Sequence, residues 1–258
     1  MTLRPSPLPI WAIVDKLLCR CSTAKNFVWD KPMRLRSAVV LAGLLLLSAC
    51  DVDSRYEVFL SDLIDSLNRP QPPVFVNSTF RVEMSSSQKC NDLKDRLIQI
   101  LSSYYRDVGE AKCIRENMND FLAFVAKSPI LPYTDGNLKF TGGIVSGLAV
   151  SRNEAGEVVL YAVIDRARQR TLEAELAQVF SQSVDIKINS VLIDLNNDSR
   201  TDYLIDGPSM FVNGEPVVDY SAKVSRRDKV TLALSDVARS KLSKDGSWPI
   251  ITISEAKQ

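Results

Sequence analysis

The sequence predicts an α+β fold: a mostly antiparallel sheet with two main helices and one short helix, arranged in two modules after a signal peptide. Two observations lead to this expectation. Beyond residue 139, apolar residues form short strand-like segments separated by turn residues, which is typical of antiparallel sheets. Apolar residues recur at helical spacing in fewer places, most clearly after Ser85 and after Asp165.

The region that ends at Cys50 has the order of a secretion signal. Arg34 and Arg36 precede an apolar run over residues 38–47, and two small residues separate this run from Cys50. The run is shorter than the roughly 20 residues that span a bilayer, and it fits the apolar region of a signal peptide. The alternative is a buried helix of the core that happens to end in cysteine.

Residues 47–50 (Leu-Ser-Ala-Cys) resemble the lipobox of bacterial lipoproteins. The resemblance implies cleavage before Cys50, a diacylglycerol on its sulfur and acylation of the new amino group. Each buried methylene contributes about 0.8 kcal/mol, so three chains would hold the protein firmly to a membrane. Asp51 resembles the signal that keeps such proteins at the inner membrane, which favours its periplasmic face.

Residues 1–32 are a Pro-rich segment that precedes this signal. We expect translation to start at Met33, and the alternative is an extended signal that starts at Met1. In both cases residues 1–49 are removed and take no part in the fold.

Composition limits the function of the remaining 209 residues. They carry 25 basic and 29 acidic side chains, which argues against a nucleic-acid binder. The whole chain has no histidine, so Ser-His and Cys-His nucleophiles and His-ligated metals are excluded. We therefore expect no enzyme and no cofactor.

The cysteines also point to export. With Cys19 and Cys21 removed and Cys50 lipidated, only Cys90 and Cys113 remain. Two cysteines in an exported domain favour a disulfide, which would contribute about 3 kcal/mol. The alternative is two buried free thiols.

The mature chain is expected in three parts. Residues 50–73 form the lipid-anchored N-terminus, a polar tether over 51–55 and a first strand or turn. Residues 74–135 form an α+β module that contains the disulfide. Residues 136–258 form a β-rich α+β module.

Local patterns predict the elements within these parts. Residues 56–67 fit either a strand followed by a helical turn from Ser61, which we favour, or one helical stripe. The remaining expected strands cover residues 74–84, 111–113, 121–127, 144–150, 157–164, 184–195, 202–212, 215–224, 230–234 and 248–253, and the expected helices begin near residues 86, 165 and 235. Asn213-Gly214 is a strong signal for a two-residue hairpin turn.

One motif resembles a metal loop. Asp194, Asn196, Asp198 and Asp202 place oxygen ligands at alternate positions, as in calcium loops. The glycine and the bidentate acid that an EF-hand requires are missing, and Asn and Asp also form turns without metal. The favoured interpretation is a polar hairpin tip, so no metal is expected and calcium is the weaker alternative.

Arg166, Arg168 and Arg170 open the second main helix. They could bind an anionic partner, but a solvated helix face is the more common role of such residues.

Two blocks resemble an uncharacterised family of small lipoproteins encoded by phages, prophages and integrated elements. One runs from residues 84–90 through the following helix to residues 111–113 and 127–130, and the other covers residues 225–236. The resemblance implies an accessory role in the envelope and brings no catalytic residues.

Together these observations predict a membrane-anchored, periplasm-facing lipoprotein that binds another envelope component and not nucleic acid. Its expected partners are the membrane, through Cys50, and an envelope protein. The alternatives are a surface-exclusion or immunity factor, and a carboxylate-dependent hydrolase of envelope polymers.

Overall fold

The computed structural model describes residues 48–69, 72–133, 140 and 143–256. They belong to one compact unit, Leu45–Gln258. The predictions for residues 1–47, which include the basic and apolar parts of the signal, lie outside the described residues.

The fold is α+β and mainly sheet, as predicted: four helices and eleven strands are described. The strands form one sheet in the order β10-β7-β1-β2-β4-β5-β6-β11-β8-β9, with β3 paired to β4. Because β10 also pairs with β8, the pairings form a closed circuit, with β3 and β9 outside it. All pairs are antiparallel except β1 with β7 and β4 with β5.

The prediction of a polar tether over residues 51–55 is wrong, because β1 runs through it from Ser48 to Phe59. Its outward-facing charges have partners on neighbouring strands: Arg81 donates to Asp53, and Arg55 forms a two-pronged ion pair with Asp194. Pairing allows these charges to lie within a sheet, so a polar composition did not exclude a strand here.

The favoured interpretation of the next segment is confirmed, since a helix follows the first strand. The first half of the described chain comprises β1 (Ser48–Phe59), α2 (Leu60–Asn68), β2 (Val74–Met84), α3 (Ser87–Leu101), β3 (Arg106–Glu116) and β4 (Asn119–Pro132). Ser86 caps α3 by accepting a hydrogen bond from the backbone N–H of Lys89.

The second half also follows the predicted pattern. It comprises β5 (Ser146–Arg152), β6 (Val158–Ile164), α4 (Arg166–Phe180), β7 (Val184–Asn196), β8 (Tyr203–Val212), β9 (Glu215–Val224), β10 (Lys229–Leu234), α5 (Asp236–Asp245) and β11 (Ser247–Glu255). Asp165 caps α4, and Ser235 caps α5. The turn at Asn213-Gly214 has positive φ at both residues, as the hairpin signal requires.

The two predicted modules share a single sheet. Strand β4, from the first, pairs in parallel with β5, from the second, and one main core cluster includes residues of both. The expected boundary between residues 135 and 136 lies outside the described residues. Parallel pairing depends on contacts distant in sequence, which local periodicity does not reveal.

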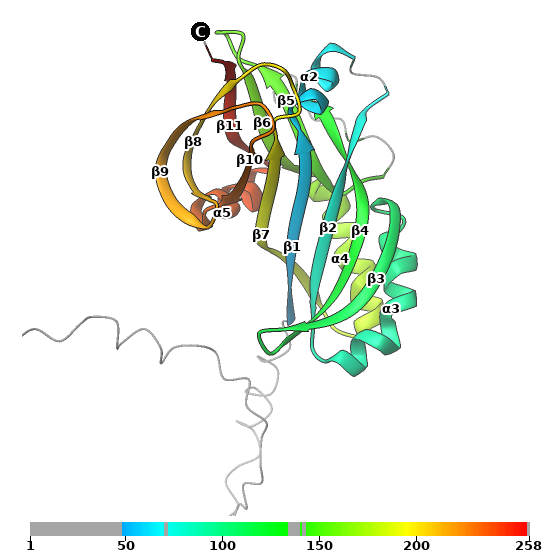
Figure 1. Ribbon diagram of the computed structural model, residues 1–258. Helices are drawn as coiled ribbons and strands as arrows, with labels where there is room; N and C mark the ends of the chain where they lie inside the picture. The colour runs from blue at the N-terminus through cyan, green and yellow to red at the C-terminus, as the bar shows by residue number, and fades with distance from the viewer. Residues whose placement is uncertain (1–47, 70–71, 134–139, 141–142, 257–258) are drawn as a thin grey trace, which may run out of the picture. The chain divides into compact units, whose positions relative to one another are not determined.

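Helices α3 and α4 pack against each other on one side of the long strands β7, β1, β2 and β4, and α5 lies beside β7 and β11 (Figure 1). The apolar side chains between these helices and the sheet form the main core. None of the described helices has the length and hydropathy that crossing a membrane requires.

Candidate functional site

Cys50, the predicted lipidation site, lies near the start of β1. Its side chain is 7% exposed and belongs to the main core cluster, and its thiol is free. Alternate residues of a strand share a face, so Cys50 points to the same side as Val52, Ser54 and Tyr56. These four residues line an apolar cavity.

The cavity lies between the sheet and the helices α3, α4 and α5. Its volume is about 70 Å³, which is less than half that of an engineered cavity of about 150 Å³ that binds benzene. The sheet contributes Phe80, Phe124 and Ile186, and helix α4 contributes Leu172 and Leu176. The walls are therefore almost entirely apolar.

The end of the cavity away from Cys50 has a small polar cluster. The pKa of Tyr56 is raised by burial, although hydrogen bonds with Ser146 and Ser54 counteract this in part. The pKa of Tyr105 is also raised by burial, and Ser146 again opposes the shift. Both phenols therefore remain protonated at neutral pH, so they act here as hydrogen-bonding groups and not as bases.

The Cys50 thiol is also held in its protonated form. Burial, followed by the negative charges of Asp51 and Glu83, raises its pKa, while Lys89 lowers it. The thiolate is the reactive form of cysteine, and reactive cysteines lie in electropositive, accessible surroundings. This environment does not suit a catalytic nucleophile.

A lipid on Cys50 would require a rearrangement at the start of β1. The sulfur faces the interior, and the cavity is too small for an acyl chain. However, β1 pairs with β2 only from Val52 to Glu57, whereas Cys50 pairs only with Ile186 of β7. After cleavage before Cys50, the new terminal residues Cys50 and Asp51, which pair with β7 alone, would need to turn outward. Chain termini held by one neighbouring strand fray readily.

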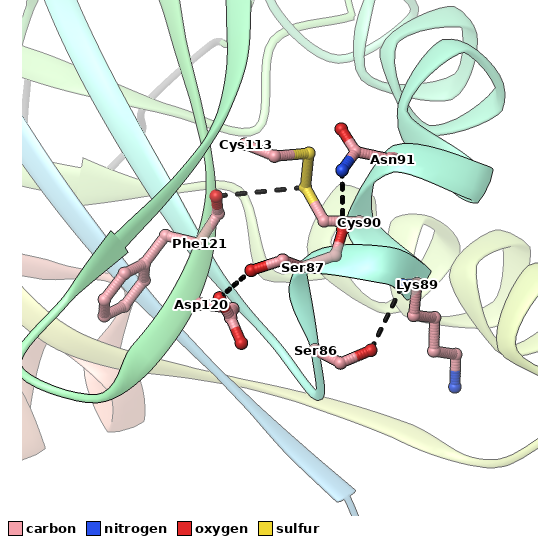
Figure 2. Close-up of a disulfide and its surroundings, with 8 residues drawn as sticks. All are labelled: Ser86, Ser87, Lys89, Cys90, Asn91, Cys113, Asp120 and Phe121. Atoms are coloured by element: carbon pink, nitrogen blue, oxygen red, sulfur yellow. Dashed lines mark hydrogen bonds between the residues drawn. A yellow bond between two sulfur atoms is a disulfide. The ribbon is translucent and has the colours of Figure 1, made fainter.

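The predicted disulfide between Cys90 and Cys113 is confirmed. It joins the first turn of α3 to β3, with the two Cα atoms 6.0 Å apart (Figure 2). Cys90 is fully buried, and its sulfur lies 3.8 Å from the carbonyl oxygen of Phe121 in β4. The Ser87 hydroxyl donates to Asp120 at the start of β4, so both strands of the β3–β4 hairpin are attached to α3 within four residues of its tip.

The four calcium candidates are not brought together around one point. Asp194 interacts with Arg55, Lys229 and Thr231 on strands β1 and β10. The Asp198 carboxylate instead accepts hydrogen bonds from the backbone and the hydroxyl of Ser61.

The other two candidates are also engaged elsewhere. The Asn196 side chain donates to the Val58 carbonyl, and Asp202 pairs with Lys223 and accepts a hydrogen bond from the Arg226 backbone. Among the described residues, no group of three or more acidic, Cys or His side chains could hold a metal ion.

The charge on Asp194 has a structural role. Burial alone would raise the pKa of this carboxyl, but hydrogen bonds from Arg55 and Thr231 outweigh it, and the pKa is lowered. Asp194 therefore joins three strands as a carboxylate.

The arginines of α4 are spread around its first turns. Arg166 donates to the backbone carbonyl of Lys244 at the end of α5, and Arg168 lies near Gly143 and Tyr104. Arg170 lines a polar groove between α4 and α5 together with Glu173 and Asp236. The mixture of charges in this groove does not select an anion.

The sequence reasoning missed the tip of the β3–β4 hairpin, at Asn117 and Met118. Met118 is 86% exposed, the most exposed large apolar side chain in the described part of the chain. A two-residue gap between two strand patterns would have indicated the hairpin, but Asn-Met is not among the usual turn pairs.

Two comparisons with known proteins bear on this geometry. A family model described as a domain of unknown function (DUF7424) matches residues 52–257. No curated protein matches the chain.

Proposed function

The chain belongs to the DUF7424 family, and from this premise we propose that it is a lipid-anchored protein of the bacterial envelope. In this proposal Cys50 carries the lipid, the domain that follows faces the periplasm, and the protein acts by binding another envelope component and not by catalysis.

One coincidence carries the proposal. The basic residues, the apolar run and the small residues end at Cys50, and the family match begins only two residues later, at Val52. A signal that ends just before the family match begins is expected if the segment before Cys50 is removed and the matched domain stays behind.

The disulfide and the cavity are compatible with this role. Disulfides persist in oxidising compartments such as the periplasm. The neutral tyrosines that line the cavity offer no base to an enzyme mechanism.

The accessory character of the protein is the finer part of the proposal. It rests on the blocks at residues 84–90 and 225–236, which resemble lipoproteins encoded by phages and other mobile elements. In the described fold, the outer edges of β3 and β9 lie outside the closed circuit of strands, and an open strand edge can pair with another chain.

The anchor can be tested by expressing the full chain in a Gram-negative host fed with alkyne-tagged palmitate. We expect the label to be incorporated and the mature protein to begin at Cys50 by mass spectrometry. A Cys50→Ala variant should lose the label and move to the aqueous phase in detergent partitioning. A Cys19→Ala/Cys21→Ala variant, which keeps Cys50, is the matched control and should behave like the wild type.

Recovery of unlabelled wild-type protein that retains residues 1–49 would refute the anchor. The binding role is tested separately, by crosslinking intact envelopes and purifying the protein with whatever is attached to it. Repeated recovery of the protein alone would count against a binding function.

A further inference from the structure

We propose that the tip of the β3–β4 hairpin inserts Met118 into the membrane leaflet that holds the lipid on Cys50. This inference rests on the proposed function and extends it, because it defines which end of the domain touches the bilayer. The partner is a phospholipid surface, and the contact is made by the apolar side chain of Met118.

The first observation is that the fold does not explain Met118. Its φ is +67°, in the left-handed region that a bulky side chain rarely adopts. Glycine is the residue usually found at this position of a two-residue hairpin turn. Met118 is therefore unfavourable both for its backbone conformation and for its exposure, and such outliers cluster at functional positions.

The second observation is the position of the tip relative to Cys50. Val52 of β1, Val82 of β2 and Leu122 of β4 lie opposite one another in a row across the sheet. Strands β1 and β4 run in the same direction, since each is antiparallel to β2. Cys50 lies two residues before this row and Met118 lies four residues before it, towards the same end.

Strand geometry converts these positions into distances. At about 3.3 Å per residue, the tip extends roughly 7 Å farther than Cys50 from the body of the domain, and it lies about two strand spacings, or roughly 10 Å, to the side. Figure 1 shows the β3–β4 turn at the end of the sheet where β1 begins. A leaflet that holds acyl chains on Cys50 is therefore within reach of the tip.

The third observation is the chemistry of the tip. Asn117, Met118 and Asn119 carry no charge, so their approach to the lipid headgroups requires no ion to be desolvated. Of the two acids that flank the tip, Glu116 is paired with Arg81 and Asp120 accepts a hydrogen bond from Ser87. The flexible thioether side chain of methionine adapts to irregular apolar surroundings, such as the boundary between lipid headgroups and acyl chains.

The hairpin is also held in place before it meets the membrane. Cys113 lies four residues from Asn117, and its disulfide attaches β3 to α3. The hydrogen bond from Ser87 to Asp120 holds the other strand next to the tip. With the protein tethered through Cys50, the tip meets the membrane at a high effective concentration. The weak membrane affinity of one apolar side chain is then enough to keep it inserted.

The test uses tryptophan as a depth probe in the lipidated full-length protein. Trp248 is the only tryptophan after Cys50, and a Trp248→Phe background removes its signal. Met118→Trp then places one fluorophore at the tip, and the matched control, Ala155→Trp, places one in the β5–β6 turn at the opposite end of the sheet. Both proteins are reconstituted in phosphatidylcholine vesicles with phosphatidylglycerol and brominated phosphatidylcholine, which quenches tryptophan on contact.

We expect at least a twofold loss of fluorescence and a blue shift for Met118→Trp, and no change for Ala155→Trp. A protein that floats with the vesicles but whose probe at position 118 is not quenched would overturn the contact and leave the anchor intact. Protection of that probe from acrylamide without quenching by lipid would overturn it as well, in favour of a protein partner or a second copy. Failure to float would overturn the anchor and the contact together.

A second variant does not depend on introducing tryptophan. Met118→Gly is expected to fold, because glycine suits the turn. In the lipidated protein it should increase limited proteolysis of the β3–β4 hairpin on vesicles, whereas Met118→Leu should leave it unchanged. Equal protection of the wild type, Met118→Gly and Met118→Leu from the protease would contradict the proposal.

Discussion

Two hairpins of this protein turn in the same way but are built differently. Both the β3–β4 and the β8–β9 hairpins have two-residue loops with positive φ at both positions, Asn117-Met118 in one and Asn213-Gly214 in the other. The second uses the residue pair that this turn favours, whereas the first places a large, exposed apolar residue where glycine is preferred.

Their attachments differ as well. The backbone and side chain of Asn213 exchange hydrogen bonds with the backbone of Thr231 in β10, so the β8–β9 tip is part of the sheet. The β3–β4 tip projects, and its hairpin is fixed further back by the disulfide. The comparison indicates that the residues of the β8–β9 tip are explained by the stability of the fold. The β3–β4 tip instead retains Met118, which the stability of the turn does not favour.

The largest effect is expected from removing the disulfide. Cys90→Ala/Cys113→Ala should lower the free energy of unfolding by about 3 kcal/mol, because the crosslink closes a loop with a sequence separation of 23. Urea denaturation measures this loss. Hydrogen exchange should accelerate in β3 and β4 and not in β8 and β9, and equal acceleration in both hairpins would mean that the disulfide does not hold the β3–β4 hairpin specifically.

A somewhat smaller effect is expected at Asp194, on the side of the other hairpin. Asp194→Asn should lower the free energy of unfolding by about 2 kcal/mol at pH 7, because it removes a buried carboxylate that accepts hydrogen bonds from Arg55 and Thr231. Loosening Thr231 should increase hydrogen exchange at Asn213 and leave the β3–β4 tip unchanged.

The pH dependence of that loss has a defined sign. The pKa of Asp194 is lower in the folded protein than in the unfolded chain, where it is about 3.9, so the carboxylate stabilises the fold fully above that value. Its contribution disappears as the pH falls through the folded pKa. The difference between wild type and Asp194→Asn should therefore shrink below about pH 4, and a constant difference would rule out the charge as its cause.

Exchanging the two tips should have opposite effects of about 1 kcal/mol each. Met118→Gly should raise the free energy of unfolding, because glycine adopts positive φ without steric strain, and Gly214→Met should lower it for the same reason. Thermal or urea denaturation of both variants measures the pair. If Met118→Gly destabilised the protein, Met118 would be contributing to the fold and the comparison would fail.

The smallest effect distinguishes the asparagines. Asn213→Ala should destabilise by about 1 kcal/mol, since it leaves the Thr231 backbone N–H without its side-chain acceptor. Asn117→Ala should cost less, roughly a few tenths of a kcal/mol, through the preference of asparagine for positive φ alone. Equal losses would show that the two tips are anchored alike.

Much of the fold could be predicted because its signals are local. The caps at Ser86 and Asp165, the helical stripes that follow them and the Asn213-Gly214 turn all depend on residues close in sequence. The disulfide followed from the cysteine count and from the export that the sequence predicts. The strand over residues 51–55 was missed because its charges are paired with Arg81 and Asp194, which lie far away in the sequence.

The candidate site was predicted only in part. Cys50 was singled out by the motif around it, but its place in the wall of an apolar cavity was not predicted. The Asp194 to Asp202 segment was expected as a polar hairpin tip or, as the weaker alternative, a calcium loop. It is not a hairpin, because β7 and β8 do not pair with each other, and Asp194 lies among Arg55, Lys229 and Thr231 on neighbouring strands.

The amino-acid sequence alone therefore determined the class of the fold, most of its helices and strands, and the pair of cysteines that form the disulfide. These depend on periodicity, capping and composition, which act over a few residues or over the whole chain. Only the tertiary structure decided that β1 lies beside β7, that Cys50 faces the core, and that the Met118 tip shares its end of the sheet. The first depends on pairs more than 100 residues apart, such as Cys50 with Ile186, and the last depends on Val82 lying opposite both Val52 and Leu122. No local pattern specifies such registers.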